Sequence, residues 1–185
     1  MSLTYSEMMP LGTIAASFEL PDAVSGKTLS LDELKSEIGT VIMFICNHCP
    51  YVIHIENEIA AIANEYQKKG IAFVAISAND AENYPADAPD KMKIKAAEVG
   101  YSFPYLYDES QNTANAYQAS CTPDFYVFDG NLNCVYRGRM DESSPGNGKL
   151  VTGVELRTAL DAVIDGSPVS EKQLPSMGCG IKWKR

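Results

Sequence analysis

Two short apolar runs flank a long amphipathic segment in the first half of the chain. Residues 40–45 (TVIMFI) and 71–77 (IAFVAIS) are rich in β-branched residues and are typical of strands buried on both faces. Between them, apolar residues recur at spacings of three and four until Gly70 ends the pattern. The recurring residues are Val52, Ile55, Ile59, Ile62 and Tyr66. Two buried strands around one helix predict a parallel β-α-β crossover.

Capping residues and turn residues predict the other elements. Ser30 and Glu33 form a capping box for a short helix that Gly39 ends. A hairpin is expected over residues 124–138, where two alternating strands surround the turn sequence DGN. Three more helices are predicted from their capping residues, which are Asp87 for a helix through Val99, Asp108 with Gln111, and Thr152 with Glu155.

The order of these elements is β-α-β-α-(β)-α-β-β-α. A parallel crossover combined with an antiparallel hairpin predicts an α/β fold, with a mixed central sheet and helices on both faces. Because the sequence has no repeat or linker, we expect one domain over residues 1–185. The tail 167–185 has no clear period, but its tryptophan, Trp183, suggests that the tail packs on the body.

Charge and hydropathy narrow the partners and the location. The 185 residues carry a net charge of -9, which argues against nucleic acid as a partner, because phosphate binding needs a basic surface. The sequence has no run of about 18 apolar residues, so no membrane span is predicted. The N-terminus also lacks the basic and apolar regions of a signal peptide. We therefore expect a cytoplasmic protein without a membrane partner, unless a leader has been removed.

The cysteines are the candidate chemistry. There are five, which argues against a framework of structural disulfides, because the number is odd and the chain looks cytoplasmic. Metal binding, redox catalysis and packing therefore stay open as roles. The five are Cys46, Cys49, Cys121, Cys134 and Cys179.

The motif Cys46-Asn47-His48-Cys49 lies where the first buried strand ends and the long helix begins. Unpaired N–H groups and the helix dipole stabilise an anion there, so we expect a lowered pKa for Cys46, and protonated His48 would lower it further. Cys49 lies one turn into the helix, within reach of Cys46 for a reversible disulfide. A zinc site needs about four ligands, whereas this motif offers two cysteines and His48, with Cys121 as the one further candidate. The position therefore favours a redox pair over zinc or core packing, and no metal is expected.

Several motifs together resemble a known family. The sequence FICNHCP after a buried strand, followed later by CTPDFYVFD, resembles the thioredoxin superfamily. The opening PLGTIAASFELPDAVSGKTLSLDEL resembles the alkyl hydroperoxide reductase and thiol-specific antioxidant branch. YPADAPDKMKIKAAEVGYSFPYLYD, GRMDESSPGNGK and PSMGCGIKWK resemble the peroxiredoxin-like subgroup that carries a thioredoxin-type CxxC motif. The resemblance covers nearly the whole chain.

The resemblance implies a thioredoxin-like fold and thiol–disulfide oxidoreductase activity, with Cys46 as the attacking thiol and Cys49 as the resolving thiol. Thr122-Pro123 would match the cis-proline segment that faces the CxxC motif and holds an extended substrate. The expected partners are protein or small-molecule disulfides and dithiols and an electron donor of unknown identity, and no cofactor is expected. The alternatives are a thiol-dependent peroxidase and a non-enzymatic redox-sensing or metal-binding module.

Three positions depart from the relatives. Met43 stands where a peroxiredoxin has a threonine, which argues against copying its peroxide chemistry. Thr40 stands where thioredoxin has a buried acid, so the proton of Cys49 needs another acceptor, for which Asp124, Glu56 and water are the candidates. His48 between the cysteines is expected to make the pair more oxidising than a Gly-Pro pair does.

Cys121 and Cys179 are possible additional redox residues. Cys121 precedes Pro123 by two positions, and it is either a third redox thiol or a small packing residue. Cys179 lies in the glycine-flanked sequence MGCG, where it is either a mobile relay or resolving thiol or an incidental exposed thiol.

Overall fold

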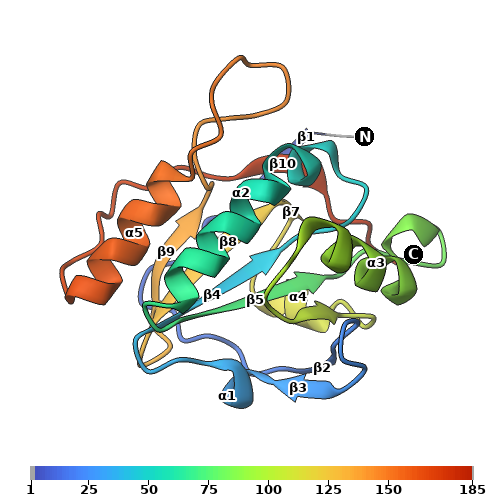
Figure 1. The fold of residues 1–185 in the computed structure, drawn as a ribbon, viewed down its shortest axis with the longest axis horizontal. Coiled ribbons are helices and arrows are strands. Elements are labelled where there is room, and N and C mark those ends of the chain that lie inside the picture. The colour runs from blue at the N-terminus through green and yellow to red at the C-terminus, as the bar shows by residue number, and fades with distance from the viewer. Residues whose placement is uncertain (1–2, 185) are drawn as a thin grey trace.

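A computed structural model of the protein describes residues 3–184 and has a five-stranded sheet at its centre (Figure 1). The strand order is β6-β5-β4-β8-β9. The first three of these strands run parallel to one another, and the hairpin strands β8 and β9 are antiparallel. The predicted mixed sheet is therefore confirmed. The strands are β4 (Gly39–Phe44), β5 (Ile71–Ser77), β6 (Tyr105–Tyr107), β8 (Asp124–Asp129) and β9 (Cys134–Gly138).

Two smaller sheets accompany the central sheet. One has the order β1-β10-β7 and the other pairs β2 with β3. The first of them joins an N-terminal strand and a strand of the tail to the segment that precedes Pro123. These strands are β1 (Leu3–Tyr5), β2 (Glu19–Pro21), β3 (Thr28–Ser30), β7 (Cys121–Thr122) and β10 (Met177–Gly180).

Helices cover both faces of the central sheet, as the sequence predicts. Residues of α2, α3 and α5 belong to one hydrophobic cluster, and residues of α1 and α4 belong to the cluster on the other face. The α-helices are α1 (Leu31–Leu34), α2 (Pro50–Gln67), α3 (Pro89–Val99), α4 (Asn112–Ala116) and α5 (Val154–Asp165), and a single 3₁₀ turn, η1 (Pro85–Asp87), precedes α3.

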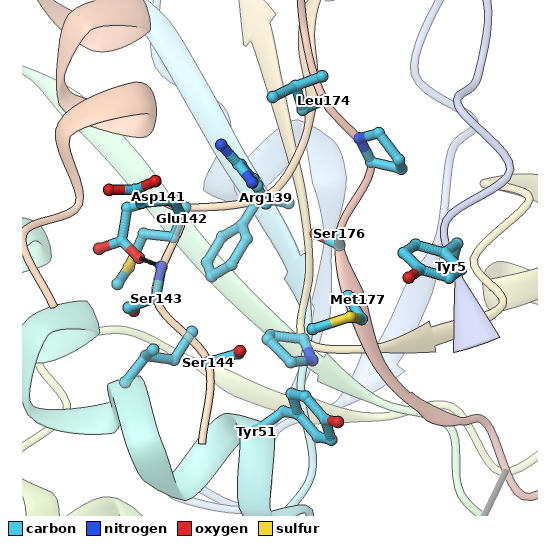
Figure 2. A pocket seen from close by; sticks show the side chains of 15 residues that line it. Tyr5, Tyr51, Arg139, Asp141, Glu142, Ser143, Ser144, Leu174, Ser176 and Met177 are labelled. Atoms are coloured by element: carbon cyan, nitrogen blue, oxygen red, sulfur yellow. Dashed lines mark hydrogen bonds between the residues drawn. The ribbon is translucent and has the colours of Figure 1, made fainter. Parts of the chain in front are cut away.

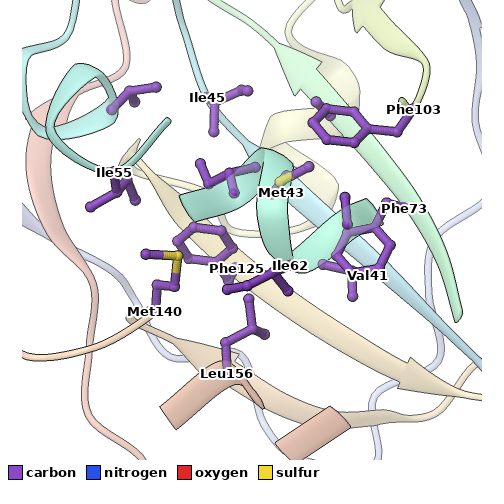
Figure 3. Packing of buried hydrophobic residues seen from close by; sticks show 14 of the residues in the cluster. Val41, Met43, Ile45, Ile55, Ile62, Phe73, Phe103, Phe125, Met140 and Leu156 are labelled. Carbon is purple, nitrogen blue, oxygen red and sulfur yellow. The ribbon is translucent and has the colours of Figure 1, made fainter. Parts of the chain in front are cut away.

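The core explains why β4 is apolar without alternation. Val41 and Met43 pack in the cluster under α2 (Figure 3), whereas Ile42 and Phe44 pack in the cluster on the opposite face. Every residue of β4 is buried, because both faces of a central strand are covered. All five apolar positions predicted for α2 are buried as well.

The first predicted helix is shorter than its sequence pattern indicates. The capping box of Ser30 and Glu33 is present, but the helix ends at Leu34 and Gly39 begins β4 instead of closing a helix. The hydroxyl of Thr40 accepts a hydrogen bond from the Ser36 N–H at 3.0 Å, which gives that backbone group a partner outside a helix.

Of the three other predicted caps, those at Asp87 and Thr152 are wrong and the one at Asp108 and Gln111 is confirmed. Asp87 ends the 3₁₀ turn, and α3 starts after Ala88. The predicted cap of Asp108 and Gln111 is present, because Gln111 is the N-cap residue of α4 and Asp108 Oδ2 accepts from the Ala114 N–H at 2.8 Å; the side-chain amide of Gln111 also donates to the carbonyl of Lys182 in the tail. The predicted Thr152–Glu155 cap is also wrong, since Gly153 is the N-cap residue of α5.

The tail is attached through its backbone. Strand β10 pairs with both β1 and β7, and the N–H of Lys182 donates to Asn79 Oδ1 at 2.8 Å. Trp183 is 40% exposed, so the indole is not the anchor that the sequence suggests. Among residues 3–184, no helix has the length and apolar character needed to cross a membrane.

Candidate active site

The CNHC motif lies at the junction of β4 and α2, as the sequence predicts. Cys46 follows the strand, Cys49 is the N-cap residue of α2, and Pro50 is its first residue, where a missing N–H costs little. Cys46 and Cys49 are both reduced thiols and are only 2% and 0% exposed. The junction therefore holds two buried sulfurs at the end of a central strand.

The segment Thr122-Pro123 faces these sulfurs. The sulfur of Cys49 lies 3.2 Å from the carbonyl oxygen of Thr122, and the sulfur of Cys46 lies 3.5 Å from the Thr122 hydroxyl. The Thr122–Pro123 peptide bond is cis, as the resemblance implies. The fold thus brings together Cys46, Cys49, Thr122 and Pro123, which are distant in the sequence.

The two thiols have opposite pKa shifts. The hydrogen bond from Cys46 lowers the pKa of Cys49 to about 5, and hydrogen bonds from Cys179 and Thr122 lower it as well. The same contact with Cys49, burial and the charge of Asp87 raise the pKa of Cys46. The lowered pKa predicted for Cys46 therefore lies on its partner, because the contact with Cys49, burial and the Asp87 carboxylate all raise the pKa of Cys46.

One thiolate of the pair should consequently be present at neutral pH. We expect the ultraviolet absorbance of the thiolate in the reduced protein to rise with a midpoint near pH 5, because the pKa of Cys49 is about 5. Cys49→Ser should remove that transition, whereas Cys134→Ser should keep it, because burial raises the pKa of Cys134 to about 11. A transition that survives Cys49→Ser would contradict the assignment.

Cys121 and Cys179 both border the pair from the small sheet. Cys179 is 3% exposed and lies opposite Thr122 in the register of β10 and β7, so it is neither the exposed nor the mobile thiol that the sequence suggests. Its flanking Gly178 leaves no room for a side chain, because a Cβ there would lie 2.0 Å from the Thr122 carbonyl oxygen. Burial raises the pKa of Cys179 to about 12 and that of Cys121 further, which favours packing roles for both thiols.

Asp87 is the residue of this site that the helix-cap prediction missed. It is completely buried, and its Oδ1 accepts hydrogen bonds from the N–H groups of Asn47 at 2.8 Å and His48 at 3.3 Å. Its Oδ2 lies 2.6 Å from His48 Nδ1 and accepts a hydrogen bond from Asn79 at 2.7 Å. The loop after β5 is the signal that could have revealed it, since the carboxyl ends of parallel strands meet at one edge of a sheet.

The two acidic residues predicted as proton acceptors lie elsewhere. Glu56 pairs with Lys95 at 3.1 Å. Asp124 contacts the hydroxyl of Tyr126 at 2.9 Å, and Tyr126 packs in the cluster on the sheet face opposite α2. Asp87 and His48, by contrast, each have a side-chain atom within 4.8 Å of the Cys46 sulfur.

The same residues are the candidates for holding a metal ion. Cys46, His48 and Asp87 bring three potential ligand atoms within 4.8 Å of one another. Both oxygens of Asp87 are already engaged, each by two hydrogen-bonding groups of the loop and its neighbours. This geometry favours a hydrogen-bonded group over an open cage for a cation.

A cavity of about 280 Å³ opens beside Pro123 (Figure 2). Tyr51 of α2, Tyr5 of β1 and Met177 of β10 line it together with the loop that follows β9. Arg139 borders the cavity with its guanidinium bound to Glu155 through contacts of 2.6 to 3.1 Å, so its charge is already paired. The cavity offers an apolar wall next to the cis-proline.

Comparison with known proteins relates this arrangement to a family. The model of the AhpC/TSA family matches residues 11–137. The crystal structure of an uncharacterized conserved protein from Geobacillus kaustophilus is 56% identical, has a TM-score of 0.98, and is matched over 100% of this chain and 97% of that chain.

Two more remote proteins have named activities. The thiol-disulfide oxidoreductase ResA of Halalkalibacterium halodurans is 26% identical over 133 residues, which are 71% of this chain and 70% of that protein. A secreted disulfide oxidoreductase of Mycobacterium tuberculosis is 15% identical with a TM-score of 0.62, over 78% of this chain and 95% of that chain. This last similarity concerns the fold alone, and it confirms the expected thioredoxin-like fold.

Proposed function

The chain belongs to the AhpC/TSA family, and from this premise we propose that it is a thiol–disulfide oxidoreductase whose Cys46 and Cys49 cycle between dithiol and disulfide. The observation that carries the proposal is the position of both sulfurs against Thr122, at 3.5 and 3.2 Å, beside the cis-proline. The named activity of the relative from Halalkalibacterium halodurans supports the same chemistry.

The reaction begins with the thiolate that the pair shares. A proton moves from Cys46 to Cys49 across their hydrogen bond, and the Cys46 sulfur attacks a substrate disulfide. The substrate S–S bond breaks, one substrate thiolate leaves, and a mixed disulfide forms on Cys46. Cys49 then gives its proton to the substrate thiolate that has left and attacks the Cys46 sulfur, which closes the Cys46–Cys49 bond and releases the second substrate thiolate. Two electrons have passed from the protein to the substrate.

The cavity next to Pro123 supports a polypeptide or small-molecule disulfide as substrate. Its apolar wall can cover the residues that flank a substrate cysteine, while the backbone of Thr122 lies next to the reacting sulfurs. A separate thiol donor must reduce the Cys46–Cys49 disulfide to complete the cycle.

A comparison of two oxidants tests the proposal. We expect the wild-type protein, with dithiothreitol as donor, to reduce a model disulfide at least about tenfold faster than it reduces hydrogen peroxide, because Met43 offers no hydroxyl to orient a peroxide. Steady-state consumption of each oxidant is the measurement. Faster peroxide reduction would favour the thiol peroxidase instead, and turnover of neither oxidant would refute both enzymatic functions.

A further inference from the structure

The two residues between the cysteines are both fixed by the 3₁₀ turn η1. Asp87 of this turn accepts hydrogen bonds from the N–H groups of Asn47 and His48. The Ala86 carbonyl accepts a further one from the side-chain amide of Asn47 at 2.9 Å. On the other side, Asn47 Oδ1 accepts from the hydroxyl of Tyr105 at 3.1 Å. The conformation of the CxxC loop is therefore tied to a second loop far along the chain.

Asp87 brings a buried negative charge to this loop. Its oxygen lies 2.6 Å from His48 Nδ1, and one of its carboxylate oxygens lies within 4.8 Å of the Cys46 sulfur. The ring of His48 is also held in place from outside, because it stacks on Tyr84 at 5.8 Å with an interplanar angle of 6°. A positive charge on His48 would lie directly against the Asp87 carboxylate. The carboxylate would therefore offset the stabilisation that this charge gives to a nearby thiolate.

A carboxylate and an imidazolium have opposite effects on a dithiol pair. A positive charge stabilises the thiolate of the reduced form and makes the pair more oxidising, whereas a negative charge destabilises it and favours the uncharged disulfide. The motif CNHC alone predicts only the first effect. The structure adds the second effect, because the Asp87 carboxylate, like His48, lies within 4.8 Å of the Cys46 sulfur.

We propose that Asp87 is the positioning residue and counter-charge of the CNHC motif, which holds Asn47 and His48 in place and makes the Cys46–Cys49 pair more reducing than its His48 alone would. This proposal rests on the proposed redox function of the pair. It opposes the expectation, drawn from His48 in the sequence, that the pair is more oxidising than a Gly-Pro pair.

The test is the equilibrium of the pair with a glutathione redox buffer. Asp87→Asn keeps an oxygen that can accept from the two N–H groups but removes the charge, so the reduced form should gain roughly tenfold over the disulfide, equivalent to about 30 mV. Asp80→Asn is the matched control, because Asp80 lies on the same loop and is also buried but bonds Glu82 and Asn83. This control should leave the equilibrium within about twofold of the wild type.

The outcomes separate the two proposals. If the wild type forms no Cys46–Cys49 disulfide in the buffer, the redox function itself fails. If the disulfide forms but Asp87→Asn shifts the equilibrium no more than Asp80→Asn does, or shifts it toward the disulfide, the role of Asp87 fails alone.

A measurement on the wild type covers the case in which Asp87→Asn does not fold. The nitrogen NMR spectrum of histidine-labelled protein should show a proton on His48 Nδ1, which donates to Asp87. The chain has two histidines, so His54→Gln assigns the signals. An unprotonated Nδ1 would overturn the proposal.

Discussion

Cys46→Ser is expected to lower the rate of disulfide reduction by at least about 10³-fold, because a hydroxyl cannot replace the attacking thiolate. The Cys46 sulfur lies against the Thr122 hydroxyl at 3.5 Å, so serine fits the same position and the fold should be retained. Steady-state reduction of a model disulfide with dithiothreitol as donor is the measurement.

Cys49→Ser should stop turnover by a different route. Cys46 can still attack, but the mixed disulfide has no resolving thiol and should accumulate as an adduct on Cys46 that mass spectrometry detects. Burial and the nearby charge of Asp87 still raise the pKa of Cys46 in this variant, so adduct formation should accelerate as the pH rises above neutrality.

Cys134→Ser is the control for both variants. Cys134 is buried on β9, in the cluster on the sheet face opposite α2. Its replacement by serine should therefore leave turnover unchanged within about twofold. If Cys46→Ser kept a tenth or more of the activity, or if the adduct formed on Cys179 instead, the assigned order of attack would be wrong.

The sequence predicts the framework of this site because its elements are long and periodic. Continuous apolar runs predict the strands β4 and β5, because both faces of a central sheet are covered and every position of the strand is buried. An apolar pattern with a period of 3.6 residues predicts the helix α2, because one side of that helix packs on the sheet. The position of Cys46 and Cys49 at their junction follows directly. Thr122-Pro123 required the resemblance to a family, since no local pattern places it opposite the cysteines.

Asp87 and Cys179 show why the remainder could not be predicted. An aspartate before a helix is more often a cap, and only the meeting of two parallel strand ends brings Asp87 to Asn47 and His48. Cys179 lies in a tail without periodicity, and its strand partners β1 and β7 are both far from the tail in the sequence. Such strand pairings depend on the assembled fold. The glycine-flanked sequence around Cys179 therefore suggests an exposed thiol, whereas the structure has a buried strand there.

Asp124→Asn is expected to stabilise the folded protein at pH 8 by several kcal/mol relative to wild type and to change little near pH 4. Asp124 is completely buried, and within residues 3–184 its Oδ1 has no hydrogen-bond partner. Burial raises the pKa of Asp124 from 3.8 to about 8, although the hydrogen bond from Tyr126 lowers it in part.

The stability of the wild type depends on pH because its folded and unfolded states bind the proton of Asp124 differently. Between pH 3.8 and about 8, the folded protein keeps the proton of Asp124 while the unfolded chain has lost it. The free energy of unfolding therefore falls as the pH rises through this interval, at about 1.4 kcal/mol per pH unit at most. Above the folded pKa the loss is complete. Asparagine does not ionise, so the variant avoids the loss while it keeps the size of the side chain.

Denaturant unfolding of both proteins at several pH values isolates this residue. Other titrating groups are shared, so the difference between variant and wild type should grow from pH 4 to pH 8 and then level off. Asp90→Asn is the control, because the Asp90 side chain is 68% exposed on α3 and its effect should stay within about 0.5 kcal/mol at every pH. A difference for Asp124→Asn that stays constant, or that shrinks toward alkaline pH, would show that this carboxyl group is ionised in the folded protein at neutral pH. It would then be a buried charge beside Pro123 that the fold stabilises by other means.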